Sequence, residues 1–258
     1  MANEVAKKSD FEVGLTTSLM SMKDALPTEL NVSRFIQNAV SFLNGNDALI
    51  EYSKKYGNAQ IKQGIMKGAV LGLDAMNKEC YLIPYGSQLN FMIDYRGNVK
   101  LAKKYSIRPI KDIYAKLVRK GDEFEEVIVN GEPSLNFKPL PFNNNEIIGA
   151  FAVCLYKDGG LVYDTMSLED LENTRKSSKA SNSPAWKNFT GEMYKKTVLH
   201  RLCKHIELEF DNANQRELFA EDVAIETDTQ KIVEQEIEEN ANQVDFSDVI
   251  DAEVIEGE

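Results

Sequence analysis

Apolar residues follow a helical spacing over the first third of the chain. Recurrence at every third or fourth position predicts three helices within 15–73. The first helix ends at Pro27, and the second follows a cap at Ser33. Residues 1–14 are polar and are expected to form a flexible N-terminus. The first part of the folded body is therefore predicted to be helical.

Glycine recurs at every fourth position of the third predicted helix, at Gly64, Gly68 and Gly72. A glycine inside a helix costs about 1 kcal/mol relative to alanine. We therefore interpret the repeat as a smooth face that allows another backbone to approach closely. Ordinary helix-on-helix packing is the simplest structural account of such a face.

The middle of the chain changes to an extended pattern. Two short strands within 79–95, separated by Gly86 and Ser87, predict a β-hairpin, and 96–105 is helical. The later strands are expected at 107–119, 124–129, 134–138, 147–157 and 161–166, and helices at 168–175 and 185–206. Strands between helical flanks predict an α+β fold with a helical N-terminal part, a central antiparallel β-sheet with packed helices, and an acidic, disordered C-terminal tail.

The last predicted helix has an apolar stripe that changes side. Trp186, Phe189 and Met193 lie at spacings of three and four, whereas Val198 and Leu202 lie on roughly the opposite side. Two interpretations remain open at this point. Either two helical pieces are offset, or one helix is buried on two sides.

Charge is strongly segregated along the chain, whose formal net charge is −11. Segment 221–258 holds 14 Asp and Glu against one Lys, which leaves 29 basic and 27 acidic residues in 1–220. Segment 96–120 has nine Lys and Arg with Asp112 as its one acid, and 175–204 has eight with Glu192 as its one acid. Two basic segments on a nearly neutral body favour a polyanionic partner. We expect three parts: the N-terminus 1–14, a binding domain 15–220 and the tail 221–258.

The location expected from the sequence is the cytoplasm. Three scattered cysteines indicate reduced thiols that act as small buried hydrophobes. No apolar run is long enough for a transmembrane helix, and the start of the chain lacks the apolar run of a secretory signal. No membrane partner is expected.

The first basic segment predicts a phosphate-binding surface. Four of its cations fall on one arc of the helix 96–105, where they repel one another unless a polyanion passes by. A solvated helix face is the alternative, but further cations follow directly. The candidate DNA-binding residues of this segment are Arg96, Lys100, Lys103, Lys104, Arg108, Lys111, Lys116 and Arg119.

The second basic segment begins with a loop rich in Ser, Asn and Pro and continues into a helix. Its DNA-binding candidates are Lys176, Lys179, Lys187, Lys195, Lys196, Arg201 and Lys204. Trp186 and Tyr95 are candidates for stacking on an unpaired base, a contact that contributes about 1–3 kcal/mol per base. The helical spacing of Trp186 favours the protein core over stacking.

Catalytic chemistry finds little support in the residues. The phosphate-binding loop GxxxxGK[ST] of ATP-driven recombinases is absent from the sequence. His200 and His205 flank Cys203, but a basic helix is a poor cation site. No catalytic residue, metal or cofactor is expected. The rival functions are a metal-dependent nucleic-acid-processing enzyme and a non-catalytic adaptor protein.

Three blocks in order resemble the RecT family of phage and prophage annealing proteins. They are GLDAMNKECYLIPYGSQLNFMIDYRGNVKLAKK (72–104), KGDEFE (120–125) and SPAWKNFTGEMYKKTVLHRLCK (183–204). Together they lie within roughly residues 60–205. The chain departs from the family pattern at Ala185, which is inserted between Pro184 and Trp186, and at HIELEF (205–210), where a more apolar ending is expected.

The resemblance implies a function and a set of partners. It implies ATP-independent annealing of single-stranded DNA, with an annealed duplex intermediate, in a homo-oligomeric ring or helical filament. It implies a phage exonuclease partner, and the acidic tail is a candidate for binding that exonuclease or a host single-strand binding protein. Competition with DNA and plain solubilisation are the other interpretations of the tail. The family's basic positions match Arg96, Lys100, Lys103, Lys195, Lys196, Arg201 and Lys204.

Overall fold

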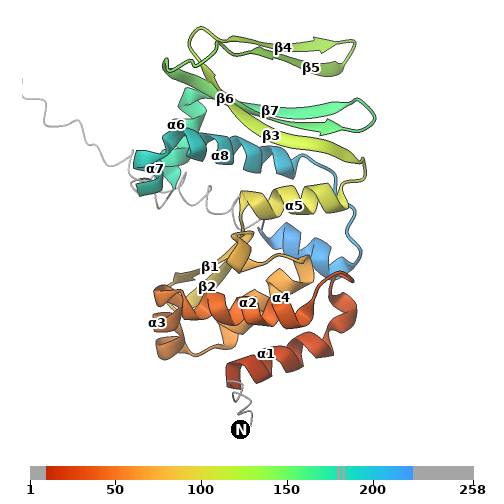
Figure 1. Cartoon of the computed structure of the whole chain (residues 1–258), viewed down its shortest axis with the longest axis vertical. Coiled ribbons are helices and arrows are strands. Elements are labelled where there is room, and N and C mark those ends of the chain that lie inside the picture. Colours follow the sequence, from red (N-terminus) through yellow and green to blue (C-terminus); the bar gives the residue numbers. More distant parts are fainter. Residues whose placement is uncertain (1–9, 179–180, 182–183, 223–258) are drawn as a thin grey trace, which may run out of the picture. The chain divides into compact units, whose positions relative to one another are not determined.

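The N-terminal helices and a β-hairpin share one apolar core (Figure 1). The computed structural model describes residues 10–178, 181 and 184–222. The elements of this part are α1 (Asp10–Ser21), η1 (Lys23–Ala25), α2 (Val32–Asn44), α3 (Asp47–Tyr56), α4 (Ala59–Leu71), η2 (Ala75–Asn77), β1 (Cys80–Tyr85) and β2 (Gln88–Ile93). Helix α1 begins inside the segment 1–14 that was expected to be flexible. Helix α2 is capped by Asn31, which accepts a hydrogen bond from the N–H of Arg34, so the cap predicted at Ser33 was wrong.

Helix α3 was not predicted, although its sequence carries the usual signals. Asn46 caps it by accepting a hydrogen bond from the N–H of Leu49 at 3.2 Å. Lys54 and Lys55 lie in its last turn, where cations interact favourably with the helix dipole. Gly57 follows with φ +79°, a conformation that glycine adopts without steric cost.

Gly64 and Gly68 of α4 lie against the β1–β2 hairpin, whereas Gly72, which caps the helix, lies against Pro27. A Cβ at Gly64 would collide with the side chain of Leu82 on β1. A Cβ at Gly68 would lie 3.6 Å from the Sγ atom of Cys80 and 2.9 Å from the carbonyl oxygen of Leu73. The smooth face therefore accommodates hairpin side chains, and the backbone that approaches it at Gly68 is that of Leu73.

Three separate antiparallel sheets are formed by the described residues, where one central sheet was expected. Strands β1 and β2 pair, and so do β4 and β5, while the third sheet has the order β3-β6-β7. The strands are β3 (Ile110–Arg119), β4 (Glu123–Val129), β5 (Glu132–Lys138), β6 (Ile147–Tyr156) and β7 (Leu161–Ser167). The α+β class is confirmed, as are the predicted strands.

The β3-β6-β7 sheet is covered on both faces. Helices α6 (Leu168–Ser177) and α8 (Thr190–Lys204) pack on one face around Leu171, Val198 and Leu202, which are fully buried (Figure 1). The β4–β5 hairpin covers the other face, where Phe124 and Phe137 contact Phe151 at ring-centroid distances of 5.3 and 5.0 Å.

Two helical pieces replace the single helix predicted at 185–206. Helix α7 (Pro184–Asn188) is separated from α8 by Phe189, whose φ of −135° and ψ of 40° are not helical. The interpretation of two offset pieces is therefore confirmed.

Helix α5 (Tyr95–Tyr105) lies against α8 and contributes Ala102 to the core of the sheet.

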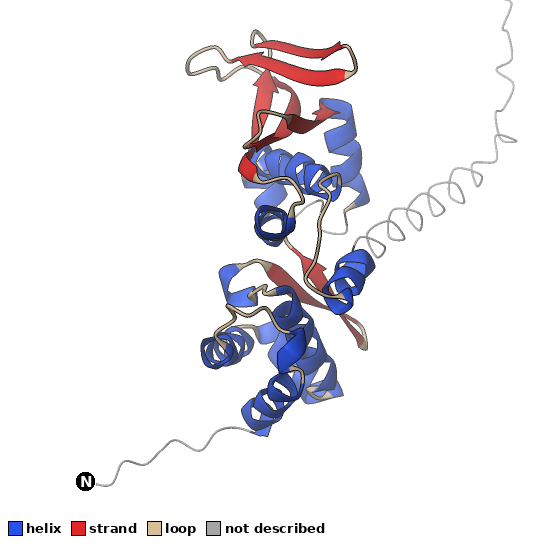
Figure 2. Ribbon diagram, turned by 90° about the vertical axis from the view of Figure 1, so that its right-hand side faces the viewer, coloured by secondary structure: helices blue, strands red, loops and turns tan. Residues whose placement is uncertain are grey.

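The segment 205–222 returns to the N-terminal core. Leu208 bridges to Ser106, Phe210 joins the N-terminal core, and residues 213–222 are helical at the end of the described chain (Figure 2). Gln215 is fully buried and donates to the carbonyl oxygen of Val70 at 3.0 Å. The chain divides into two units between Asp222 and Val223. The acidic segment beyond this point lies outside the described residues.

Within the described ranges, no helix is both long enough and apolar enough to cross a membrane.

Candidate nucleic-acid interface

Helix α5 presents the cations of the first basic segment on its exposed side. Asp94 caps the helix by accepting a hydrogen bond from the N–H of Arg96 at 3.3 Å. Gly97, Leu101 and Tyr105 are buried, and the four cations are exposed. The predicted separation of a basic face from an apolar face is confirmed. The four cations are Arg96, Lys100, Lys103 and Lys104.

Gly97 allows the start of α5 to lie directly on the start of β1. A Cβ at this position would collide with the carbonyl oxygen of Glu79. The same carbonyl accepts a hydrogen bond from the N–H of Asp94 at 3.0 Å. Gly97, which directly follows Tyr95 and Arg96, therefore has a packing role that fixes where these two residues lie.

The two basic segments meet at Tyr95, at the N-terminal end of α5. The Nε atom of Arg96 donates to the Tyr95 hydroxyl at 3.1 Å, and this hydrogen bond raises the pKa of Arg96. The guanidinium carbon of Arg96 is 5.7 Å from the centroid of the Tyr95 ring, and Lys196 Nζ of α8 is 4.9 Å from the same centroid. Lys196 Nζ also lies 3.6 Å from Asp94 Oδ2. We call Asp94, Tyr95, Arg96 and Lys196 the Tyr95 site.

Two further contacts support the Tyr95 site. Asn98 of α5 is buried, and its side-chain amide lies 2.9 Å from His200 Nδ1 of α8, which joins the two helices. Burial, followed by the carboxylate of Asp94, raises the pKa of Tyr81 on β1. Sequence reasoning missed Tyr81 and Asp94, because neither belongs to a basic segment.

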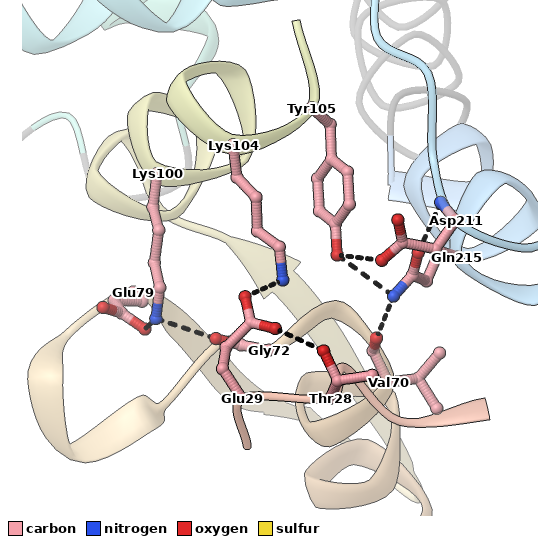
Figure 3. A network of polar contacts seen from close by, with 10 residues as sticks. All are labelled: Thr28, Glu29, Val70, Gly72, Glu79, Lys100, Lys104, Tyr105, Asp211 and Gln215. Atoms are coloured by element: carbon pink, nitrogen blue, oxygen red, sulfur yellow. Dashed lines mark hydrogen bonds and ion pairs between the residues drawn. The ribbon is translucent and has the colours of Figure 1, made fainter. Parts of the chain in front are cut away.

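The C-terminal end of α5 is tied to the N-terminal part of the chain (Figure 3). Lys100 Nζ donates to the carbonyl oxygen of Gly72 and to Glu79 Oε2, each at 2.8 Å. Lys104 forms an ion pair with Glu29, and its ammonium lies 4.9 Å from the centroid of the Tyr105 ring. These two cations already hold carboxylate partners in the folded chain.

Tyr105 extends the same set of ties to the segment 205–222 (Figure 3). Its hydroxyl donates to Asp211 Oδ2 at 3.3 Å and accepts a hydrogen bond from Gln215 Nε2 at 3.2 Å. Burial raises the pKa of Tyr105. The C-terminal end of α5 is therefore joined to both the N-terminal helices and the returning segment.

The next cations of the first segment serve local structure. Lys103 Nζ is 3.8 Å from Asp112 Oδ1. Arg108 donates to both carboxylate oxygens of Asp158, at 2.7 and 3.0 Å, and its guanidinium lies 4.1 Å from the centroid of the Tyr156 ring. These hydrogen bonds lower the pKa of Asp158. Arg108 therefore holds the turn between β6 and β7.

Two cations of β3, Lys116 and Arg119, lie beside the β4–β5 hairpin. Lys111 and Lys116 are exposed and have no ion pair among the described residues. Lys116 and Arg119 line a cavity of about 670 Å³ between β3 and the base of the β4–β5 hairpin. This cavity is on the face of the sheet opposite α8. Segment 96–120 is thus divided between two surfaces, which its sequence did not indicate.

Helix α8 carries the cations of the second segment with partners of their own. Lys195 pairs with Glu192 at 2.6 Å, and Arg201 pairs with the buried Asp164 of β7 at 2.9 Å. The second carboxylate oxygen of Asp164 is buried and has no hydrogen-bond partner in the described part of the chain. Lys204 is half-buried, Lys176 and Lys187 are exposed, and Lys179 lies outside the described residues.

Trp186 belongs to the core, so its candidate role in base stacking was wrong. Its residue surface is 4% exposed, and its ring meets Tyr194 edge-on at a centroid distance of 6.0 Å. The guanidinium carbon of Arg175 lies 5.7 Å from its ring centroid. Burial and a hydrogen bond to Glu172 raise the pKa of Tyr194 to about 12.

Other chemistry-bearing groups are dispersed or buried. No cluster of three or more His, Cys, Asp or Glu suited to a metal occurs among the described residues. Cys80, Cys154 and Cys203 are free and buried, as predicted. Burial raises the pKa of each thiol, to about 11 for Cys154 and about 12 for Cys203.

Comparisons with known proteins give a family and a relative for this chain. The chain matches the RecT family over residues 33–240, a range that includes both α5 and α8. It is also similar to Protein RecT of Escherichia coli (strain K12), with 29% identity over 202 residues, which cover 72% of this chain and 72% of the relative.

Proposed function

Because the chain belongs to the RecT family, a family of annealing proteins in phage-type recombination, we propose that it binds single-stranded DNA and pairs complementary strands without ATP. The proposal includes assembly into a homo-oligomer. It assigns the first contact with DNA to the Tyr95 site.

The convergence of Arg96 and Lys196 on one tyrosine ring carries this proposal. The two cations lie 100 positions apart in the sequence and belong to different basic segments. Among the described residues, Asp94 is the one carboxylate in contact with either side-chain cation, and its other oxygen caps α5. A phosphate placed between the two cations would therefore receive charge-assisted hydrogen bonds from two different helices. The ring of Tyr95 is then available to a neighbouring base.

The remaining candidates extend the interface along α8 and the loop before it. Arg201 is held by Asp164, which fixes one side of its guanidinium and leaves its other donors toward solvent, with 46% of the side chain exposed. Lys187 and Lys176 are exposed and could contact further phosphates. Phosphate contacts position a strand without reading its sequence, which suits a protein that must accept any sequence.

Annealing needs no covalent step in this scheme. The cations hold the backbone of one strand, and its base edges remain open to a second strand. Base pairing then provides the selectivity, so neither a nucleotide cofactor nor a catalytic residue is required. A phage exonuclease and a host single-strand binding protein are the proposed partners of the acidic tail.

Salt dependence tests the proposal directly. The logarithm of the affinity for a labelled oligo-dT should fall with the logarithm of salt concentration, with a slope of about −0.7 per phosphate contact. Two complementary labelled oligonucleotides, added in succession without ATP, should form duplex faster with the protein than without it. An affinity that hardly changes with salt would contradict the phosphate contacts. Magnesium-dependent cleavage of the same oligonucleotides would favour the nuclease alternative.

A further inference from the structure

We propose that copies of this chain join head to tail, with the tip of the β4–β5 hairpin of one copy seated in the cavity between β3 and the hairpin base of the next. This inference gives a geometry to the homo-oligomer of the proposed function and rests on that proposal. It follows from two surfaces at opposite ends of one hairpin.

The tip of the hairpin is apolar and acidic. Ile128 is 71% exposed and Val129 is 57% exposed, at the end of a hairpin closed by the two-residue turn Asn130–Gly131. Both turn residues have positive φ, 53° and 82°, as a tight hairpin turn requires. The glutamates nearest the tip have no ion pair among the described residues; they are Glu125, Glu126 and Glu132. The tight turn thus exposes two aliphatic side chains, Ile128 and Val129, with carboxylates nearby.

The cavity at the base of the hairpin has the complementary character. Its lining combines apolar and polar surface in similar amounts, and Lys116 and Arg119 contribute cations to it. Lys116 has no ion pair in the described part of the chain, and Arg119 donates to the carbonyl oxygen of Asn145 at 2.6 Å. The acids of the lining are already engaged, Asp112 by Lys103 and Asp122 by the loop that follows β5. The apolar wall residues are Leu117, Leu135, Phe137, Pro139, Leu140 and Phe151.

A rigid loop at the edge of the cavity presents an aromatic ring to solvent. Phe142 is 98% exposed with φ +53°, a conformation that phenylalanine rarely adopts. Hydrogen bonds fix the loop around it: Asn143 donates to Asp122 at 2.7 Å, and Asn145 donates to the carbonyl oxygen of Lys120 at 2.9 Å. Since Phe142 contributes little to the core of its own chain, its strained and exposed position fits contact with a second chain.

The tip cannot reach the cavity of its own chain. Strand β4 rises by about 3.3 Å per residue, so its two ends lie roughly 20 Å apart. Each contact between copies therefore leaves one tip and one cavity open, and repetition of the contact extends the chain of copies. A contact of a few side chains is small, so assembly should depend on protein concentration.

Two single substitutions, Ile128→Lys and Phe142→Asn, block the two surfaces separately. Asparagine tolerates positive φ better than phenylalanine does, so Phe142→Asn should not strain the fold of the single chain. Without DNA, sedimentation velocity should show species larger than a dimer for the wild type and monomers for each variant. An equimolar mixture of the variants should form dimers and nothing larger, because one intact tip and one intact cavity remain.

Several results would overturn the head-to-tail contact. These are a monomeric wild type at every concentration, assembly of either variant like the wild type, or no dimer in the mixture. Assembly is measured without DNA, and binding of a short oligo-dT is measured on the monomeric variants. Failure of DNA binding and failure of the contact are therefore distinguishable.

Cross-linking gives a second, independent readout. The three native thiols are buried, so a short bismaleimide should react with introduced cysteines first. A mixture of Ile128→Cys and Phe142→Cys chains should give a cross-linked dimer, and Ile128→Cys alone should not. Cross-linking of Ile128→Cys to itself would indicate a tip-to-tip contact and would reject the proposal.

Discussion

The two ends of helix α5 carry cations of the same kind in different surroundings. At the N-terminal end, Arg96 and Lys196 gather on the ring of Tyr95 beside one carboxylate that is already used as a helix cap. At the C-terminal end, Lys100 and Lys104 each have a carboxylate from the N-terminal part of the chain. Equal exposure along one helix face therefore does not mean equal availability to a ligand.

This difference separates binding from scaffolding. Lys100 and Lys104 each have a carboxylate of their own, whereas Arg96 and Lys196 share the single carboxylate of Asp94, so the N-terminal end keeps a positive charge that an added anion can neutralise. We therefore expect the N-terminal end of α5 to contribute most to DNA affinity. The C-terminal end should contribute most to the attachment of α5 to the N-terminal helices.

The largest expected effect comes from reversing both cations of the Tyr95 site. Arg96→Glu with Lys196→Glu should lower affinity for a labelled oligo-dT by roughly 100-fold, as expected for the loss of two charge-assisted contacts. The melting temperature should fall moderately, because the new carboxylate at position 196 would lie beside Asp94. Fluorescence anisotropy measures the affinity, and Lys54→Glu with Lys55→Glu on α3 is the control with the same change in charge. If both double variants lose the same DNA affinity, the effect reflects net charge alone, and the N-terminal end of α5 has no special role in DNA binding.

A smaller effect is expected when Lys100 is changed to Glu. The new carboxylate would face Glu79, so the free energy of unfolding should fall by about 1 kcal/mol. Urea denaturation measures this loss. The exchanged pair Lys100→Glu with Glu79→Lys should recover the stability and the DNA affinity together. If stability returns and affinity does not, Lys100 contacts DNA directly and the comparison fails at that residue.

Removal of the Tyr95 hydroxyl tests the N-terminal end of α5. Tyr95→Phe keeps the ring but loses the acceptor for Arg96 Nε, so DNA affinity should fall roughly three- to tenfold. Tyr95→Leu removes the ring as well and should cost more. Equal affinity in all three proteins, measured by the same anisotropy titration, would exclude a role for Tyr95 in positioning the cations.

The smallest effect concerns pH and the ion pair between Glu29 and Lys104. The hydrogen bond from Lys104 lowers the pKa of Glu29 below the usual value of a glutamate. A carboxylate with a lowered pKa in the folded state contributes stability above its unfolded pKa and loses it as pH falls through the folded value. Glu29→Gln should therefore reduce the drop in melting temperature below about pH 4.5. Thermal scans between pH 3 and 7 measure it, and an unchanged acid profile would show that this pair adds no stability.

Much of the fold was predictable because the secondary structure that each local sequence pattern favours is also the one that packs in the folded chain. The β1–β2 hairpin, α5 and the five later strands lie close to their predicted ranges, since alternation and turn residues fix them locally. Helix α3 was missed although Asn46 and Gly57 mark its ends. The glycine face of α4 was recognised, but no spacing within α4 could show that a hairpin covers it.

The candidate site was only partly predictable. The sequence located the cations of α5 and α8, and the structure brings Arg96 and Lys196 together at Tyr95. Trp186 is buried in the structure, as its helical spacing favoured. The partners of the other cations come from segments far away in the chain, so local composition could not reveal them.

By itself, the sequence determined the α+β class, the positions of most elements, the two basic segments and the acidic tail. Tertiary structure alone decided which cations are free to meet an anion. The physical reason is that electrostatic energy depends on distance in space. Segment 96–120 contains one acid, Asp112, yet Glu79, Glu29 and Asp158 reach its cations from elsewhere in the fold.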